Sequence, residues 1–243
     1  MTATPAHTLR GAIAAPCAGI IALALFSSST CREAESPASA GPAGRSWPAG
    51  TVLVVNDVPI LADDVDRIGS DYALIEPQDS LNQLRSLAIA DTIVPKIAAQ
   101  GIDPERRARA RELAERYRES LLADALPSGP LTGPMEVERS GQFRDLGFAL
   151  WRTAHPLAIG TWSEVLETPG CFHVLRVKSR EEGSLPSLTR FTIGVFNFPY
   201  VDVETARADL EAAIDRSHLI ILDDAWRYAV PAALRYRLHA ENP

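Results

Sequence analysis

The stretch TPGCFHVLRV, residues 168–177, contains two side chains that could do chemistry. Cys171 and His173 are two positions apart. Residues i and i+2 of a β-strand share one face, so the thiol and the imidazole would lie side by side. A cysteine beside a histidine is a nucleophile and base pair. No third orienting group or oxyanion-binding motif accompanies them, so the pattern alone does not support nucleophilic catalysis.

Short motifs for cofactor or metal binding are not found in the sequence. It has no glycine-rich phosphate loop, no CxxC pair and no HExxH. Two acidic pairs, Asp63 with Asp64 and Asp223 with Asp224, come where helices are predicted to begin, and carboxylates stabilise helix N-termini. We therefore expect no cofactor and no metal ion.

The composition is that of an ordinary globular protein. The chain has 243 residues, of which 46% are hydrophobic and 23% charged. Its net charge is -7 and its pI is about 5.3. This acidic balance argues against a nucleic-acid partner, because phosphate contacts require a basic surface.

The first 30 residues are typical of a targeting segment. Residues 11–26 are apolar or small, which suits the core of a signal peptide and is short for a membrane-spanning helix. Small hydroxyl residues follow at 27–30, and Cys31 comes directly after them. This junction resembles a bacterial lipoprotein cleavage site, at which Cys31 becomes the lipidated first residue. A cleaved secretion signal without lipid and an uncleaved membrane anchor are the alternatives.

We therefore expect a periplasmic protein that is secreted across the inner membrane and tethered through Cys31. Cleavage would remove Cys17 and lipidation would occupy Cys31, which leaves Cys171 without a partner for an intrachain disulfide. Residues 31–50 are rich in Ala, Pro, Ser and Gly. Because such a composition cannot bury enough apolar surface to fold, this segment should be a disordered tether.

Ordered structure is predicted to begin with a β-hairpin and a helix. Residues 51–55 are rich in β-branched side chains, and Asn56 and Asp57 are a turn signal before a short return strand. Pro59 has no N–H to donate to a ladder, so the return strand should lie at a sheet edge. The following helix carries apolar residues at helical spacing, namely Val65, Ile68, Tyr72 and Ile75.

Two further helices are predicted before residue 127. The first starts near Ser80, should be kinked or divided at Pro95, and should end at Gly101 as a left-handed C-cap. The second starts at Asp103, an acidic N-cap followed by proline, and extends to about Leu126. The residues that it is predicted to bury are Ala110, Leu113, Tyr117 and Leu121.

The opposite face of this second helix is rich in arginine. Such a face could bind an anion or a polypeptide, or it could be a solvated surface with stabilising pairs such as Glu112 and Arg116. We favour the solvated surface. The arginines are Arg106, Arg107, Arg109, Arg111, Arg116 and Arg118.

Strand-like patterns follow a proline- and glycine-rich linker at 127–134. A short helix is predicted over 141–155, and strands at 162–168 and 171–177 should form a hairpin that turns at Pro169 and Gly170. No strand that carries a second histidine is predicted upstream of residue 157. A third strand, a helix, an apolar strand-like run and a final helix are predicted at 190–198, at 203–214, at 218–222 and after Asp223.

Two stretches resemble one family of folding factors. VLVVNDVPILADDVDR, followed by a helix, a long helix, AAQGID and another helix, resembles the N-terminal chaperone segment of SurA-type and PpiC-type periplasmic proteins. PLAIGTWSEVLETPGCFHVLRVKSREEG resembles the last half of a parvulin peptidyl-prolyl isomerase domain. The residues that occupy the parvulin pattern are Leu157, Gly160, Ser163, Val165, Thr168, Phe172 and His173.

The parvulin resemblance implies an active-site position for His173. In that family a second histidine, on the strand that opens the domain, faces it. Here no such strand is predicted and His155 falls on a predicted helix, although the strand at 190–198 could supply a substitute from downstream. Isomerisation needs an apolar pocket for the proline ring and polar groups that favour the twisted amide. The candidate polar groups are His173, Cys171 and Ser163. The alternative is that His173 is a sheet histidine, hydrogen-bonded to a neighbouring strand or hydroxyl.

We therefore expect an α+β protein in which a helical chaperone-like portion joins a small antiparallel parvulin-like sheet with flanking helices. Its expected function is that of a cell-envelope folding factor that binds unfolded or proline-containing polypeptide, with or without isomerase activity. The alternative is a structural or scaffold lipoprotein. The expected partners are unfolded or nascent envelope polypeptides, and the membrane through Cys31. The expected divisions are a signal peptide (1–30), a tether (31–50), a helical portion (51–126), a linker (127–134), a parvulin-like portion (135–200) and a C-terminal helical segment (201–243).

Overall fold

The computed structural model describes residues 46–123 and 134–237. These residues form an α+β fold with two antiparallel sheets and several helices. The predicted signal peptide, Cys31, most of the predicted tether and most of the 127–134 linker lie outside the described residues. Within the described ranges, no helix has the length and apolar character needed to cross a membrane.

Strands and helices are interspersed along the described chain. The strands are β1 (Thr51–Val55), β2 (Val58–Leu61), β3 (Val137–Gly141), β4 (Leu166–Thr168), β5 (Cys171–Glu181), β6 (Arg190–Pro199) and β7 (Leu219–Ile221). The α-helices are α1 (Ala62–Ala73), α2 (Leu81–Leu87), α3 (Val94–Gln100), α4 (Pro104–Leu122), α5 (Phe143–Leu146), α6 (Phe148–Ala154), α7 (Ala206–Asp215) and α8 (Ala232–Arg237). A π-helical segment (Ala88–Ile93) and 3₁₀ turns (Pro186–Leu188, Asp224–Tyr228) complete them.

The smaller sheet has the strand order β2-β1-β7. Asn56 and Asp57 both have positive φ, of 49° and 63°, as the tight turn of a two-residue hairpin requires. β2 pairs only with β1, which confirms the prediction that the strand containing Pro59 lies at an edge. β7 pairs with β1 on the other side, so residues near the C-terminus complete a sheet that begins at Thr51.

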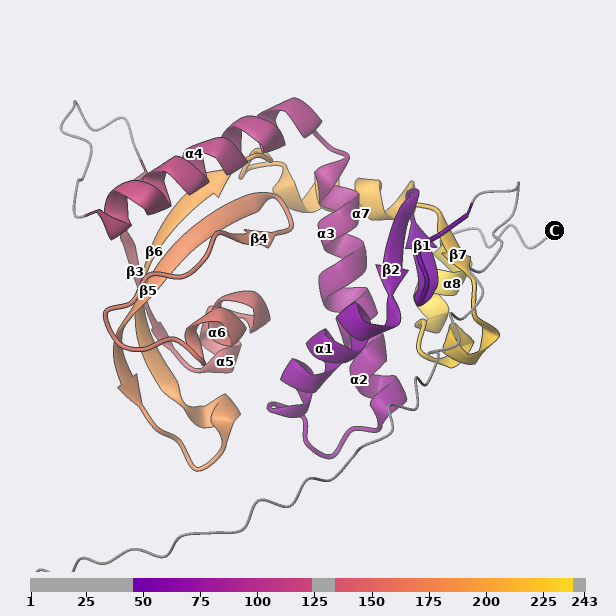
Figure 1. Ribbon diagram of the computed structural model, residues 1–243, viewed down its shortest axis with the longest axis horizontal. Helices are drawn as coiled ribbons and strands as arrows, with labels where there is room; N and C mark the ends of the chain where they lie inside the picture. The colour runs from indigo at the N-terminus through magenta and orange to yellow at the C-terminus, as the bar shows by residue number, and fades with distance from the viewer. Residues whose placement is uncertain (1–45, 124–133, 238–243) are drawn as a thin grey trace, which may run out of the picture. The chain divides into compact units, whose positions relative to one another are not determined.

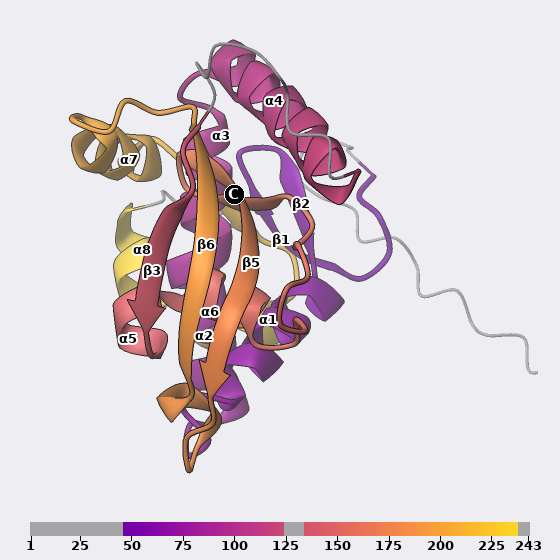
Figure 2. The same ribbon diagram turned by 90° about the vertical axis from the view of Figure 1, so that its left-hand side faces the viewer.

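The larger sheet has the strand order β3-β6-β5-β4 (Figures 1 and 2). The predicted hairpin is confirmed, because Thr168 pairs with Cys171 across Pro169 and Gly170. β3, which pairs with β6, is an additional strand that the sequence did not predict, and it contains no histidine. Its sequence, VERSG, has no apolar alternation because β3 is an edge strand whose residues are exposed up to Gly141.

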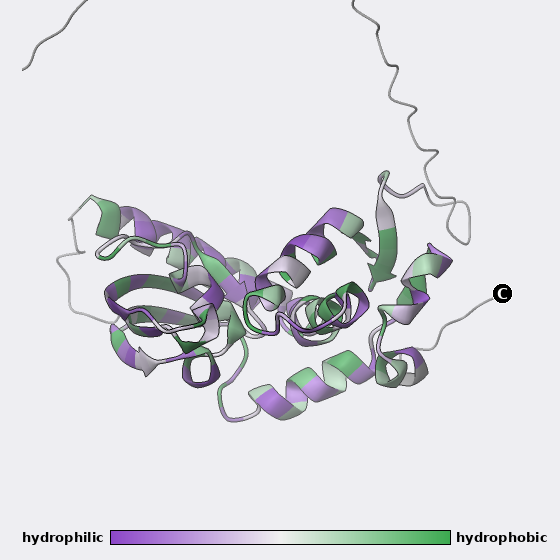
Figure 3. Ribbon diagram, turned by 90° about the horizontal axis from the view of Figure 1, so that it is seen from below, coloured by the Kyte–Doolittle hydropathy of each residue, from purple (hydrophilic) through white to green (hydrophobic). Residues whose placement is uncertain are grey.

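Alternate residues of β5 face different helices. Phe172 and Val174 belong to an apolar cluster with Tyr117 of α4, while Leu175 and Val177 belong to another with Trp151 of α6. This division follows from the two-residue period of a strand. In Figure 1, α4 accordingly lies along one face of the sheet and α5 and α6 lie against the other. Helices in Figure 3 carry both purple hydrophilic and green hydrophobic turns, as expected for helices with one face against a core.

Pro95 divides the helix that contains it, as predicted. A proline has no N–H and cannot donate to the carbonyl four residues earlier, here that of Asp91. The chain accommodates this with the π-helical segment, and the N–H of Val94 donates to the carbonyl of Ile89, five residues earlier. α3 then begins at Val94.

Two details of the helix predictions are wrong. Gly101 has a φ of -85°, so the C-cap of α3 is right-handed. The chain needs no left-handed residue there, because it turns within two residues into the N-cap Asp103 of α4. Leu113 is 43% exposed, because the buried line of α4 passes through Ala110, Ala114, Tyr117 and Leu121.

Glu167 of β4 connects the larger sheet to α3 and α4. Its carboxylate, whose side chain is only 10% exposed, accepts hydrogen bonds from Arg107 at 2.6 and 3.1 Å and from Gln100 at 3.2 Å. Lys96 forms an ion pair with it at 3.5 Å. Burial raises the pKa of Glu167, but the hydrogen bonds and charges of Arg107 and Lys96 outweigh burial, so the pKa lies below its ordinary value.

A second connection joins α1 and α6. The rings of Tyr72 and Phe148 are stacked, with centroids 3.7 Å apart and planes at 8°. Beside them Arg152 forms an ion pair with Asp71. Together with Glu167, these contacts hold the larger sheet and its helices against the N-terminal helices.

We predict that Glu167→Gln lowers the free energy of unfolding by about 1–3 kcal/mol at pH 7, because Arg107 then lacks a buried anionic partner. A carboxylate whose pKa is lowered by folding stabilises the protein above its unfolded pKa and loses that effect as the pH falls through the folded value. The difference between wild type and Glu167→Gln should therefore narrow below about pH 4. Urea unfolding of both proteins at a series of pH values measures this difference in the free energy of unfolding.

Glu164→Gln is the matched control. Glu164 pairs with Arg118 but its side chain is 85% exposed, so its removal should change stability by less than about 1 kcal/mol. A difference for Glu167→Gln that stays constant from neutral to acidic pH would contradict the assigned role of the charge.

Candidate functional site

His173 lies at the centre of a small polar group on the larger sheet. It pairs with Leu166 of β4 on one side and with Asn197 of β6 on the other. Its Nδ1 is 2.8 Å from Oδ1 of Asn197, and its Nε2 is 2.8 Å from Oγ1 of Thr168. The two contacts engage both ring nitrogens with the strands on either side, and the side chain is buried.

These contacts define the protonation of the ring. Nδ1–H donates to the Asn197 carbonyl oxygen, which leaves Nε2 facing the Thr168 hydroxyl, whose one hydrogen Nε2 shares with the carbonyl oxygen of Cys171 at 3.2 Å. Burial lowers the pKa of His173 below its ordinary value, and the charge of Arg139 lowers it further, although the hydrogen bond to Asn197 raises it. The ring is therefore neutral at pH 7 and has no free nitrogen for a substrate.

Cys171 lies next to His173, as predicted, but the two do not form a reactive pair. Sγ is 3.9 Å from Nδ1 of His173, and that nitrogen is bonded to Asn197. The thiol donates instead to the carbonyl of Phe172 at 3.2 Å. Burial raises the pKa of the Cys171 thiol to about 11, so little nucleophilic thiolate exists at neutral pH.

Ser163 holds the segment before β4 against β5. Its side chain is 1% exposed, accepts from the N–H of Leu175 at 3.1 Å and donates to the carbonyl of Glu164 at 2.7 Å. Its own N–H donates to the carbonyl of Leu175 at 2.8 Å. None of these bonds reaches Cys171 or His173, so the structure does not bring all three candidate polar groups together.

Asn197 is the residue that the sequence did not single out. β6 lies next to β5, so the strand at 190–198 does take the central place from downstream. Asn197 stands opposite His173, where the resemblance calls for a second histidine. The sequence feature that could have indicated it is a single polar amide within the apolar run VFNFP. The register of β5 and β6 is needed to show that this amide faces His173.

Two cavities, of about 460 and 490 Å³, lie beside β4. None of His173, Cys171 and Ser163 lines either of them. The first, which we call the apolar cleft, has a volume of about 460 Å³ and lies between β2, α1 and α3 on one side and α6 and β4 on the other. Its walls include the apolar side chains of Val58, Ile60, Ile68, Ile97, Phe148 and Leu166.

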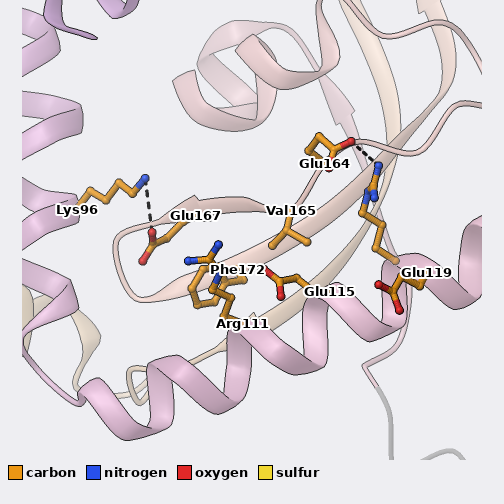
Figure 4. A pocket seen from close by; sticks show the side chains of 9 residues that line it. Lys96, Arg111, Glu115, Glu119, Glu164, Val165, Glu167 and Phe172 are labelled. Carbon is orange, nitrogen blue, oxygen red and sulfur yellow. Dashed lines mark hydrogen bonds and ion pairs between the residues drawn. The ribbon is translucent and has the colours of Figure 1, made fainter. Parts of the chain in front are cut away.

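The second cavity, which we call the charged cleft, has a volume of about 490 Å³ and lies between α4 and β4 (Figure 4). Three ion pairs line it: Lys96 with Glu167, Arg111 with Glu115, and Arg118 with Glu164. Glu119 of α4 and the apolar side chains of Val165 and Phe172 complete it. In the described part of the chain, no three His, Cys, Asp or Glu side chains group together to hold a metal ion.

Comparison of the sequence with protein-family models and with curated proteins, and of the fold with solved structures, gives no match.

We predict that Asn197→Asp raises the pKa of His173 by about 1–3 units, because a carboxylate facing Nδ1 stabilises the imidazolium. An NMR titration of the His173 ring protons measures the shift. Asn56→Asp, in the β1–β2 turn, is the control and should leave that titration unchanged. An unchanged pKa in Asn197→Asp would show that the two side chains do not face each other.

We also predict that iodoacetamide alkylates Cys171 at pH 8 roughly a hundredfold more slowly than a free cysteine, because of the raised thiol pKa. Mass spectrometry of the peptide that contains Cys171 measures the rate. In urea the rate should rise to that of free cysteine. Alkylation of the folded protein at the free-cysteine rate would contradict a buried, protonated thiol.

Proposed function

We propose that this protein is a cell-envelope folding factor of the parvulin and SurA type, which binds unfolded or proline-containing polypeptide without isomerising it. The observation that carries the proposal is the apolar cleft, which two strand edges and three helices enclose. Secretion across the inner membrane and a lipid anchor on Cys31 belong to the same proposal, and place the cleft in the periplasm.

The walls of the apolar cleft suit the side chains that an unfolded polypeptide exposes. Aliphatic residues come from β2, α1 and α3, and Phe148 of α6 faces them across the cleft. Transfer of apolar surface from water into such a cleft is favourable by about 25 cal/mol per Å², whatever the sequence of the client. The two arginines beside these walls are paired, Arg67 with Asp64 and Arg152 with Asp71, so neither presents an unpaired charge to an apolar segment.

The surroundings of His173 favour binding over catalysis. Prolyl isomerisation has a barrier of about 18–20 kcal/mol, and lowering it requires polar groups aimed at a bound, twisted amide. Both ring nitrogens of His173 are occupied by Asn197 and Thr168, and His173 lines neither of the two clefts nor the cavity of about 370 Å³ that its partner Asn197 lines. Isomerase activity is therefore the less favoured function.

We predict that the purified protein suppresses aggregation of a chemically unfolded test protein at near-equimolar ratios, as measured by light scattering. Val58→Asp places a charge at the mouth of the apolar cleft and should raise the amount needed for half-suppression by about tenfold. Val203→Asp is the matched control, because Val203 is 79% exposed and lies outside both clefts.

Three results would contradict this function in different ways. If Val58→Asp acts like wild type, polypeptide is not bound in the apolar cleft. If wild type does not suppress aggregation, the structural lipoprotein alternative is favoured. If catalytic amounts accelerate a proline-limited refolding reaction and His173→Ala removes the effect, the protein is an isomerase.

A further inference from the structure

We infer that the outer edge of β4 is a strand-addition site. The occupant is an extended segment of a client polypeptide with apolar residues at alternate positions and a basic residue at one end. This inference rests on the proposed function and specifies how the client is recognised. Its backbone would bond to Glu167, its apolar side chains would enter the apolar cleft, and its basic end would reach the charged cleft.

The backbone of Glu167 is oriented for this role. In an antiparallel hairpin the hydrogen-bonded pairs alternate with pairs whose backbone groups point outward. Thr168 and Cys171 flank the two-residue turn as a hydrogen-bonded pair, so in the next pair, Glu167 with Phe172, the N–H and C=O of Glu167 point away from β5. β4 pairs with β5 alone, and no hydrogen bond to this N–H or C=O is found among the described residues.

The two clefts meet at this edge. Lys96, Val165 and Glu167 line both of them, so a chain lying along β4 would pass from one cleft into the other. The Lys96–Glu167 ion pair crosses that path at 3.5 Å, and the Lys96 side chain is 40% exposed. Lys96 is therefore free to move aside while Arg107, at 2.6 Å, continues to hold the carboxylate.

The other strand edge in the apolar cleft cannot act in the same way. Val55 and Val58 flank the β1–β2 turn, so the next residue of β2, Pro59, is the one whose backbone points outward. Proline has no N–H, so this edge offers a carbonyl oxygen alone. β4 is the edge that offers both a donor and an acceptor.

Charge selects the basic end of the occupant. The ion pairs of the charged cleft join Arg111 with Glu115 and Arg118 with Glu164, while Glu119 has no ion pair within the described residues. Glu119 is thus the carboxylate of the charged cleft that is available to a lysine or arginine of the client. The apolar cleft complements the apolar part of the same segment.

The test uses a fluorescein-labelled peptide, Thr-Val-Thr-Val-Thr-Val-Lys, and two variants that are N-methylated on all valines or on all threonines. Only every second amide of an added strand faces β4, and an N-methyl group there removes the bond and blocks the approach. We expect fluorescence anisotropy to show binding that one methylated variant weakens by about tenfold or more, while the other differs from the parent by less than about twofold.

The outcomes separate this inference from the proposed function. If both methylated variants bind like the parent peptide, or if both bind equally weakly, strand addition is wrong. The proposed function is then still tested separately by the aggregation assay, which measures polypeptide binding. If the unmodified peptide does not bind, the β4 site is wrong whether or not the protein suppresses aggregation.

A second comparison tests the basic end. Glu119→Gln should weaken binding of the lysine-ending peptide about twofold to fivefold. It should not change the affinity for the same peptide with norleucine in place of the lysine. Glu112→Gln is the matched control on the same helix, since Glu112 pairs with Arg116 and lies outside the charged cleft. Equal effects of the two substitutions would overturn the assignment of Glu119.

Discussion

The buried carboxylate of Glu167 is the constraint on which the arrangement of sheet and helices depends. A charged group that is 10% exposed is stable only with partners, and its partners come from α3 and α4. Arg107 and Gln100 therefore fix where these helices lie relative to β4. The apolar and charged clefts exist on either side of β4 because the helices are held at this spacing.

The same sheet explains why the polar group around His173 is not an open reactive centre. The downstream strand β6 lies beside β5 and brings Asn197 opposite the ring. The hairpin brings Thr168 to the other nitrogen. Once these bonds are made, the ring is satisfied, neutral and buried, and it stabilises the junction of three strands. In β4, by contrast, the outward N–H and C=O of Glu167 have no hydrogen-bond partner within the described residues.

The sequence was sufficient for features that depend on local chemistry. Residue period, turn signals and caps predicted the hairpin at Pro169 and Gly170, the edge strand with Pro59, the division at Pro95 and the N-cap Asp103, and these are confirmed. The α+β class followed from the order of those elements.

Features that depend on tertiary contacts could not be predicted. β3 has no apolar face to reveal it, and the place of Asn197 depends on the register of two strands joined by a loop. The role of Glu167 could not be predicted, because its partners Arg107 and Gln100 lie 60 and 67 residues away in the chain. The two clefts are formed by segments with no common sequence signal.

Amide hydrogen exchange of the protein with and without an unfolded client tests most directly whether polypeptide binds along β4. Mass spectrometry should show slower exchange in the segments 88–97 and 162–168, which line the two clefts. Exchange in the segment 173–177, around His173, should stay unchanged. Protection confined to the segments around His173 and Asn197, with none beside Glu167, would contradict binding at the β4 edge.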